Sequence, residues 1–348
     1  MAGSAPGRRS VAGSAPREPG LRTVSRVAVV FTGGTISMEP DAAAGGAVPT
    51  LGGRAILARV AGLDAIAEVE AIDWGLVPAS HLRLGQLAKI ARLLEGTLAR
   101  PDIDGAVVVQ GTDTIEETSF CFDLLLPPAK PVVVTGAMRN AAEPDYDGPR
   151  NLADAIRCAA SDELRGAGTV VVLNGLVIGA DQAVKSDTTN FDSFQPRDGP
   201  ALGEVGAGHV RLTSRRTSQA RLPGVPDTVD ESVHLVTAAT GVDGMLIRLL
   251  RDGSPKGLVV AATGAGNTHP DMLVAAAELM ATGTVVCLTT RCWTGSVAPA
   301  YGFPGGGAQW QRAGALLSAL PASKCRVALA LGLAAGLGGD ELRRIVRA

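Results

Sequence analysis

The stretch Val27–Pro40, VAVVFTGGTISMEP, decides the fold. Its first five residues, Val27–Phe31, are all apolar, which is typical of a strand that is covered on both faces in a parallel sheet. The run stops at TGGTIS, Thr32–Ser37, where a glycine pair allows unusual backbone angles between two threonines. Ligands of open α/β sheets bind at the carboxyl ends of strands. The loop is therefore either a plain turn with locally hydrogen-bonded threonines or part of a site.

Short apolar runs alternate with helical patterns along the rest of the chain. The first series predicts strands over 27–31, 69–74, 105–110, 131–135 and 169–173, with helices over 53–62, 82–98, 115–126 and 149–161. A second series predicts strands over 232–237, 257–262 and 284–288, and helices over 242–251, 269–282 and beyond 321. Strand–helix alternation favours parallel sheets with right-handed crossovers.

The predicted fold is α/β with two domains. Residues 1–25 repeat AGSAP among Gly, Ser, Pro and Arg, a composition that predicts a disordered tail. We expect a larger N-terminal domain over 26–210, with a mainly parallel sheet flanked by helices and carrying the site. A linker over 211–230 and a smaller C-terminal α/β domain over 231–348 follow.

Composition excludes several partners. A net charge of −2 gives no electrostatic reason to expect nucleic acid or an anionic membrane. No apolar run matches a signal peptide or an 18-residue span, so we expect a cytoplasmic protein. The five cysteines lack a metal-like spacing, which favours reduced, mostly buried thiols. A dinucleotide site is not indicated, because no GxGxxG motif is present.

Four strand-ending loops combine small residues with hydroxyls, amides or charges: 32–37, 110–118, 135–140 and 262–269. In the second loop, GTDTIEET, Thr114 and Glu117 fit a capping box, a purely structural alternative. A threonine hydroxyl attacks only when a base takes its proton, and a lysine, an aspartate and a second threonine form such a set. Lys185 lies among small polar residues in DQAVKSDTTNFDSF, where the plain alternative is a solvated loop lysine.

Together these segments resemble the bacterial-type L-asparaginase (glutaminase/asparaginase) family. The likeness is carried by TGGTIS, QGTDTIEETSFCFDLLL, KPVVVTGAMR, DYDGPRNLADAI, ADQAVKSDTTNFDSF and GAGNTH, in the family's order from about Val27 to the C-terminus. It implies hydrolysis of a side-chain amide through a covalent acyl-enzyme, without a metal or organic cofactor. It also implies a homodimer or homotetramer, because a neighbouring subunit completes the site in this family.

The resemblance also assigns residues. Thr35 is the implied nucleophile and Thr112, Asp113 and Lys185 are the implied triad, while Thr32 shapes the turn. Asp113 also binds the substrate's α-amino group. The remaining substrate-binding positions implied by the likeness are Gly34, Ser80, Gly111, Ala137, Asn267 and His269.

Some positions depart from the family's pattern. No tyrosine occurs in the lid segment 37–53, so Tyr301 is the alternative source of a phenol. The family has a substrate-binding serine before the helix at 82–98, but without a gap that position is Ala79 here, so the neighbouring Ser80 is the substitute. His269 occupies a position where asparagine is usual. No clear counterpart of the acidic residue that some relatives contribute near 294–301 is present.

Four interpretations therefore stay open. The first is hydrolysis of free L-asparagine, and the second is the same chemistry on glutamine, a D-amino-acid amide or a larger asparaginyl compound. The third is a non-catalytic binding protein on the same fold. The fourth, a subunit of a tRNA-dependent amidotransferase, is disfavoured by the low-complexity tail.

Overall fold

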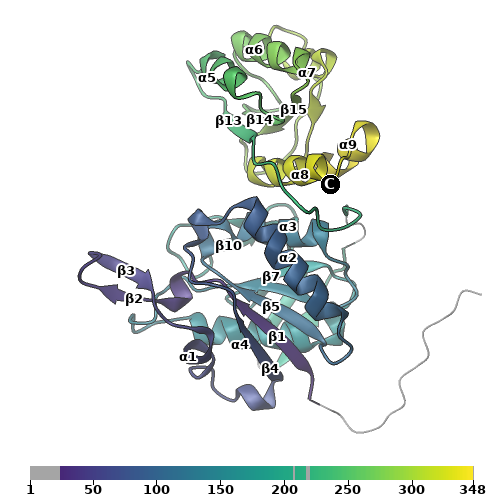
Figure 1. Ribbon diagram of the computed structural model, residues 1–348. Coiled ribbons are helices and arrows are strands. Elements are labelled where there is room, and N and C mark those ends of the chain that lie inside the picture. The colour runs from purple at the N-terminus through teal and green to yellow at the C-terminus, as the bar shows by residue number, and fades with distance from the viewer. Residues whose placement is uncertain (1–23, 207, 217–219, 348) are drawn as a thin grey trace, which may run out of the picture.

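The computed structural model describes residues 24–206, 208–216 and 220–347. Nearly all of the predicted tail, 1–25, lies outside the described residues. Two α/β units follow one another along the chain (Figure 1). No helix among the described residues is long and apolar enough to cross a membrane.

The N-terminal part is built on an eight-stranded sheet of order β12-β11-β8-β7-β6-β5-β1-β4. Its five parallel strands are β1 Arg26–Phe31, β4 Glu68–Asp73, β5 Gly105–Val109, β6 Val132–Thr135 and β7 Thr169–Leu173. The sequence predicted these strands within a residue at either end. The antiparallel edge consists of β8 Leu176–Gly179, β11 Gly203–Gly206 and β12 His209–Leu212.

Strand β1 is covered on both faces, as its apolar run predicts. Val27, Val29 and Phe31 face one core, whereas Ala28 and Val30 face another. The first core contains α1 Gly53–Leu57 and α4 Gly148–Ala160, and the second contains α2 Leu84–Ala99 and α3 Ile115–Leu125. Side chains alternate across a strand, so an unbroken apolar run fits only a sheet between two helical layers.

The C-terminal domain has a smaller parallel sheet of order β13-β14-β15-β16. Its strands are β13 Val233–Thr237, β14 Gly257–Ala262, β15 Val285–Thr290 and β16 Leu316–Leu317. One face packs on α5 Met245–Leu250, α6 Pro270–Ala281 and α7 Gly307–Ala313. On the other side lie α8 Ala322–Ala334 and α9 Gly339–Arg347. Figure 1 shows α8 at the base of this domain, facing α3, and residues of both helices belong to one core.

Two short hairpins lie outside the main sheets. Strands β2 Met38–Asp41 and β3 Gly46–Pro49 pair directly after the TGGTIS loop and project from the domain (Figure 1). Strands β9 Ala183–Lys185 and β10 Phe194–Pro196 form the second hairpin, which carries Lys185. The first hairpin is the predicted lid segment.

Candidate active site

Strand β1 delivers the TGGTIS loop to the carboxyl edge of the large sheet. Thr32 is fully buried, and both its backbone N–H and its hydroxyl donate to the carbonyl of Val109, at 3.0 Å and 3.1 Å. Thr35 begins a short 3₁₀ turn that ends at Ser37. The Thr32 hydroxyl is thus used to fix the turn. For Thr35, no hydrogen bond of the hydroxyl is found within the described residues.

The glycine pair lets this loop touch the GTDT loop. Gly33 and Gly34 have φ angles of 109° and 91°, a region that favours glycine. A Cβ added to Gly34 would lie 2.0 Å from the backbone nitrogen of Gly111. Because Thr35 follows Gly34 and Thr112 follows Gly111, this contact places the two threonines on adjoining loops.

Lys185 joins the second threonine to the aspartate. Its Nζ donates to the Thr112 hydroxyl at 2.9 Å and to the Asp113 carboxylate at 2.7 Å. The Lys185 side chain is 14% exposed and the Asp113 side chain is 71% exposed. The structure thereby brings Thr112, Asp113 and Lys185 together from β5 and β9, and Lys185 is not a solvated loop lysine.

A carboxylate of helix α3 holds the backbone of the strand that carries Lys185. The Glu116 carboxylate accepts a 2.7 Å hydrogen bond from the backbone N–H of Lys185. Burial raises the pKa of Glu116, against the lowering effect of that hydrogen bond. Glu116 was not singled out by the sequence, because its role depends on a strand 69 residues away.

The predicted capping box of the GTDT loop, with Thr114 and Glu117, does not form among the residues that the structure describes. Within the described chain, α3 has no side-chain cap at its N-terminus, so Thr114 and Glu117 form no capping box. The Thr114 hydroxyl instead donates to the carbonyl of Ala79 at 3.1 Å. The loop therefore uses Thr114 to hold the 79–81 turn rather than to begin the helix.

Two further predicted binding residues, Ser80 and Ala137, lie near these loops. The exposed Ser80 lies in the turn Ala79–His81, which packs against the Thr112–Thr114 turn. Ala137 is buried, so only its backbone is available to a ligand. The preceding Gly136 lies against the GTDT loop, since an added Cβ would be 2.5 Å from the Gln110 carbonyl.

The predicted residues of the C-terminal domain have their observed partners within that domain. The His269 imidazole accepts a 3.3 Å hydrogen bond from the Asp271 N–H and caps α6. Asn267 pairs through its backbone with Thr263, and its buried Oδ1 has no partner among the described residues. Tyr301 is half exposed and packs on the ring of Phe303 at 5.7 Å between centroids. No hydrogen bond joins these residues to the TGGTIS or GTDT loop within the described part of this chain.

Tyr146 is a neighbour of the TGGTIS loop, and the sequence analysis assigned it no role. Its hydroxyl donates to the carbonyl of Ile36, the residue after Thr35, at 2.7 Å. Burial raises the pKa of Tyr146 to about 12, so the phenol stays protonated and remains a donor. The motif DYDGPR was part of the resemblance, but the target of its tyrosine is set by tertiary contact.

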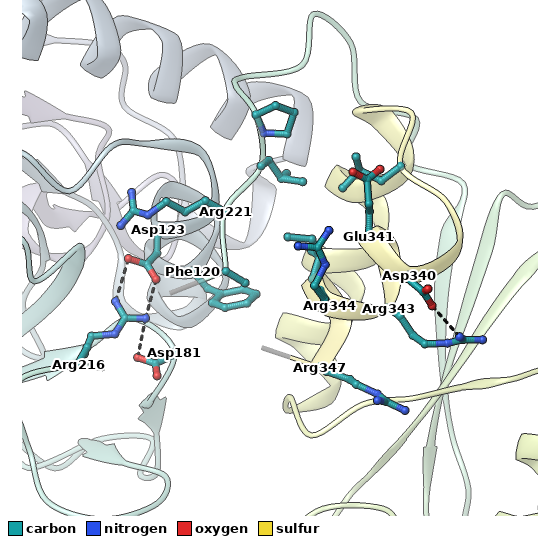
Figure 2. A pocket seen from close by; sticks show the side chains of 15 residues that line it. Phe120, Asp123, Asp181, Arg216, Arg221, Asp340, Glu341, Arg343, Arg344 and Arg347 are labelled. Carbon is teal, nitrogen blue, oxygen red and sulfur yellow. Dashed lines mark hydrogen bonds and ion pairs between the residues drawn. The ribbon is translucent and has the colours of Figure 1, made fainter. Parts of the chain in front are cut away.

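A cavity of about 890 Å³ lies elsewhere in the described structure. Figure 2 shows it between the chain around Arg216 and Arg221 and helix α9, with Arg216 bridging Asp123 and Asp181. None of the four predicted catalytic residues lines it. Among the described residues, no group of three His, Cys, Asp or Glu side chains could hold a metal ion.

Comparison with known proteins connects this geometry to a family. "Asparaginase, N-terminal" matches residues 26–218, and "Glutaminase/Asparaginase C-terminal domain" matches residues 232–346. A probable L-asparaginase of Deinococcus radiodurans is 34% identical, over 93% of this chain and 97% of its own length. An L-asparaginase of Bacillus licheniformis is 28% identical, over 89% and 95% of the two chains.

The fold agrees with a solved structure as well. The crystal structure of a probable cytoplasmic L-asparaginase from Campylobacter jejuni superimposes with a TM-score of 0.82 at 25% identity. The match covers 92% of this chain and 99% of that one. The predicted resemblance is confirmed over both domains. The chain belongs to the asparaginase family and is an asparaginase-type amidohydrolase.

Proposed function

We propose that the protein hydrolyses the side-chain amide of L-asparagine to L-aspartate and ammonia through a threonine acyl-enzyme. One observation carries the proposal: Lys185 Nζ bridges the Thr112 hydroxyl and the Asp113 carboxylate on a loop that touches the one bearing Thr35. The names of the similar proteins from Deinococcus and Bacillus support asparagine as the substrate.

In this mechanism Thr35 Oγ1 attacks the amide carbon and forms an ester while the C–N bond breaks. Its proton passes through the Thr112 hydroxyl to Lys185 Nζ, which acts as the base, and the Asp113 carboxylate positions the lysine side chain. The proton is then delivered to the departing nitrogen, which leaves as ammonia. Water attacks the ester by the same route and releases aspartate. Backbone N–H groups of the glycine-rich loops hold the developing oxyanion.

The binding assignments follow the exposure of each group. The Asp113 carboxylate is open to solvent and suited to the substrate's α-ammonium. Ser80 is exposed beside it, whereas Gly34, Gly111 and Ala137 offer backbone atoms. Glutamine or another amide is the second candidate, because the lid hairpin 38–49 carries no tyrosine.

We further propose that the active form is a homodimer or homotetramer. Among the described residues, the side chains of Asn267 and His269 make no hydrogen bond to the loops that carry Thr35, Thr112 and Lys185, and we infer that a second copy brings such residues to the substrate. Exposed apolar side chains of α5, Met245, Leu246 and Leu249, offer a surface for such a contact. A cytoplasmic location is also proposed, supported by the description of the Campylobacter relative.

The test compares two threonines of one loop. Thr35→Val and Thr32→Val each remove one hydroxyl without changing side-chain shape. Thr35→Val should lower ammonia release at least about a thousandfold. Thr32→Val should lose stability, since Thr32 bonds Val109, yet keep measurable turnover. Ammonia release unchanged in Thr35→Val would refute the assignment.

A second measurement identifies the substrate. Ammonia release is compared for asparagine, glutamine and D-asparagine, and the wild-type protein is mixed with each amide, quenched in acid and analysed by intact mass. An aspartyl ester on Thr35 would support asparagine. A preference for another amide would keep the chemistry and change the substrate.

A further inference from the structure

We propose that Lys324, in the C-terminal domain, is a positioning residue for Lys185 and holds the strand that carries it. The inference rests on the proposed function only in taking Lys185 as the lysine that handles the proton. Lys324 lies in the first turn of α8, and among the described residues its hydrogen-bond partners are backbone carbonyls rather than Thr35, Thr112 or Asp113. It acts through β9.

The Lys324 side chain is completely buried between the domains. Its Nζ donates to the carbonyl of Ala183 at 2.7 Å and to the carbonyl of Asp181 at 2.9 Å. It also lies 6.0 Å from the centre of the Phe120 ring on α3. A buried ammonium is costly unless it is hydrogen-bonded. Two strong acceptors on one short segment therefore make a specific attachment rather than an incidental one.

The two edges of β9 are held in different ways. One edge pairs with β10, and the pairing continues just beyond both strands in the bond from Ser186 N–H to Ser193 O. On the other edge, the Ala183 carbonyl accepts from Lys324 and the Lys185 N–H donates to Glu116. A cation from α8 and an anion from α3 thus replace the missing neighbouring strand, at the two residues that flank Val184.

The two anchors are also linked to each other. Glu116 interacts electrostatically with Lys324, and Ser323, the preceding residue of α8, also favours the charged form of Glu116 and lowers its pKa. The other charges that act on Lys324 are Asp181, Glu117 and Arg197. Burial lowers the pKa of Lys324 to about 8, and the neighbouring carboxylates oppose this shift, so the side chain is cationic at neutral pH.

The consequence for catalysis is geometric. Lys185 must keep its Nζ within hydrogen-bond distance of both Thr112 and Asp113. Displacement of a catalytic group by about 1 Å costs about a hundredfold in rate. Because β9 is only three residues long, loss of the Lys324 hydrogen bonds on the edge away from β10 should move Lys185. The C-terminal domain would then set the rate of a site whose triad lies wholly in the N-terminal part.

The test uses Lys324→Met, with Arg326→Met as a matched control. Arg326 lies on the same helix and also donates to a carbonyl, that of Val233 at 2.8 Å, but within its own domain. We expect Lys324→Met to lower kcat at least about tenfold, with KM changed less than about threefold. Arg326→Met should leave both near the wild-type values. Lys324→Gln keeps an amide donor and should fall between wild type and Lys324→Met.

A second readout does not depend on activity. Hydrogen exchange of a peptide covering residues 181–186 should be faster in Lys324→Met and unchanged in Arg326→Met. A kcat within twofold of wild type, together with unchanged exchange, overturns the inference. If Lys324→Met does not fold, Lys324→Gln is judged by the same two criteria. Lys185→Met separates the two proposals: if it stays active, the proposed mechanism fails and the exchange data alone decide the role of Lys324.

Discussion

Replacing Gly34 by alanine tests the contact on which the site depends. Gly34 has a φ of 91° and a ψ of −176°, a region that is almost confined to glycine and costs other residues about 1–3 kcal/mol. The added Cβ would also lie 2.0 Å from Gly111 N and 2.3 Å from Gly111 Cα. Ordinary contact begins at 3.4 Å, so the shortfall to Gly111 N is 1.4 Å. Both obstructing atoms are backbone, and a side-chain rotation cannot relieve the overlap.

The loops must therefore separate by more than an ångström. Strain and overpacking together predict a loss of about 2–5 kcal/mol in the free energy of unfolding. We expect the loss of activity to exceed the loss of stability, because Thr35 and Thr112 directly follow the two glycines and would move with them. A misplacement of about 1 Å predicts a kcat at least about a hundredfold lower. KM should change less, since Asp113 remains exposed.

Two glycines of the lid hairpin provide controls. Gly45 has a φ of 68° with no atom within 4 Å of an added Cβ, so Gly45→Ala imposes backbone strain without overlap. Gly46→Ala imposes neither strain nor overlap. Ammonia release and urea unfolding are measured for all three variants. A Gly34→Ala protein with kcat within threefold of Gly45→Ala would show that the loop contact does not set the geometry.

Other side chains give independent tests. Tyr146→Phe removes the bond to the Ile36 carbonyl and should cost about 1 kcal/mol of stability; kcat should fall about tenfold at every pH from 6 to 10, because the phenol does not titrate there. Asp123→Ala leaves the buried Arg216 without its 2.7 Å and 2.9 Å hydrogen bonds, and urea denaturation should show a loss of about 3 kcal/mol. Burial raises the pKa of Glu117 from 4.5 to about 7, so the folded state keeps a proton that the unfolded chain releases. Stability should therefore fall as pH rises between about 4.5 and 7, by up to about 3 kcal/mol, and Glu117→Gln should remove this dependence in thermal unfolding at pH 5 and pH 8.

The sequence predicted the elements whose signal is local. The unbroken apolar run at 27–31 allowed only a strand covered on both faces, and the structure has it there. The hairpins gave no such signal. Strand β2 reads MEPD and β9 is three residues long, so neither shows a period that distinguishes a strand from a loop. Strand β8 and its partners β11 and β12 are short and were not predicted for the same reason.

The residues of the candidate site also fall into two groups, those that the sequence predicted and those that only the fold identifies. Thr112, Asp113 and Lys185 were predicted by motif, and their hydrogen bonds bring them together. The groups that hold them were not predicted. In the sequence, Glu116 is an ordinary residue in the first turn of an amphipathic helix. Lys324 is one of several cations in the predicted helical tail. Their targets lie 69 and 141 residues away in the sequence, so only the tertiary fold identifies them.

The two tyrosines of the chain show why the lid could not be worked out from composition. Tyr301, the predicted alternative to a lid tyrosine, packs on Phe303 in the C-terminal domain. Tyr146 contacts the TGGTIS loop, but its hydroxyl donates a hydrogen bond to the Ile36 carbonyl and not to the Thr35 hydroxyl. The Tyr146 phenol therefore stabilises the backbone of the turn. In the proposed mechanism, activation of the Thr35 hydroxyl depends on Thr112 and Lys185 instead. Activity that survives in Tyr146→Phe but not in Thr112→Val would follow directly from this division of roles.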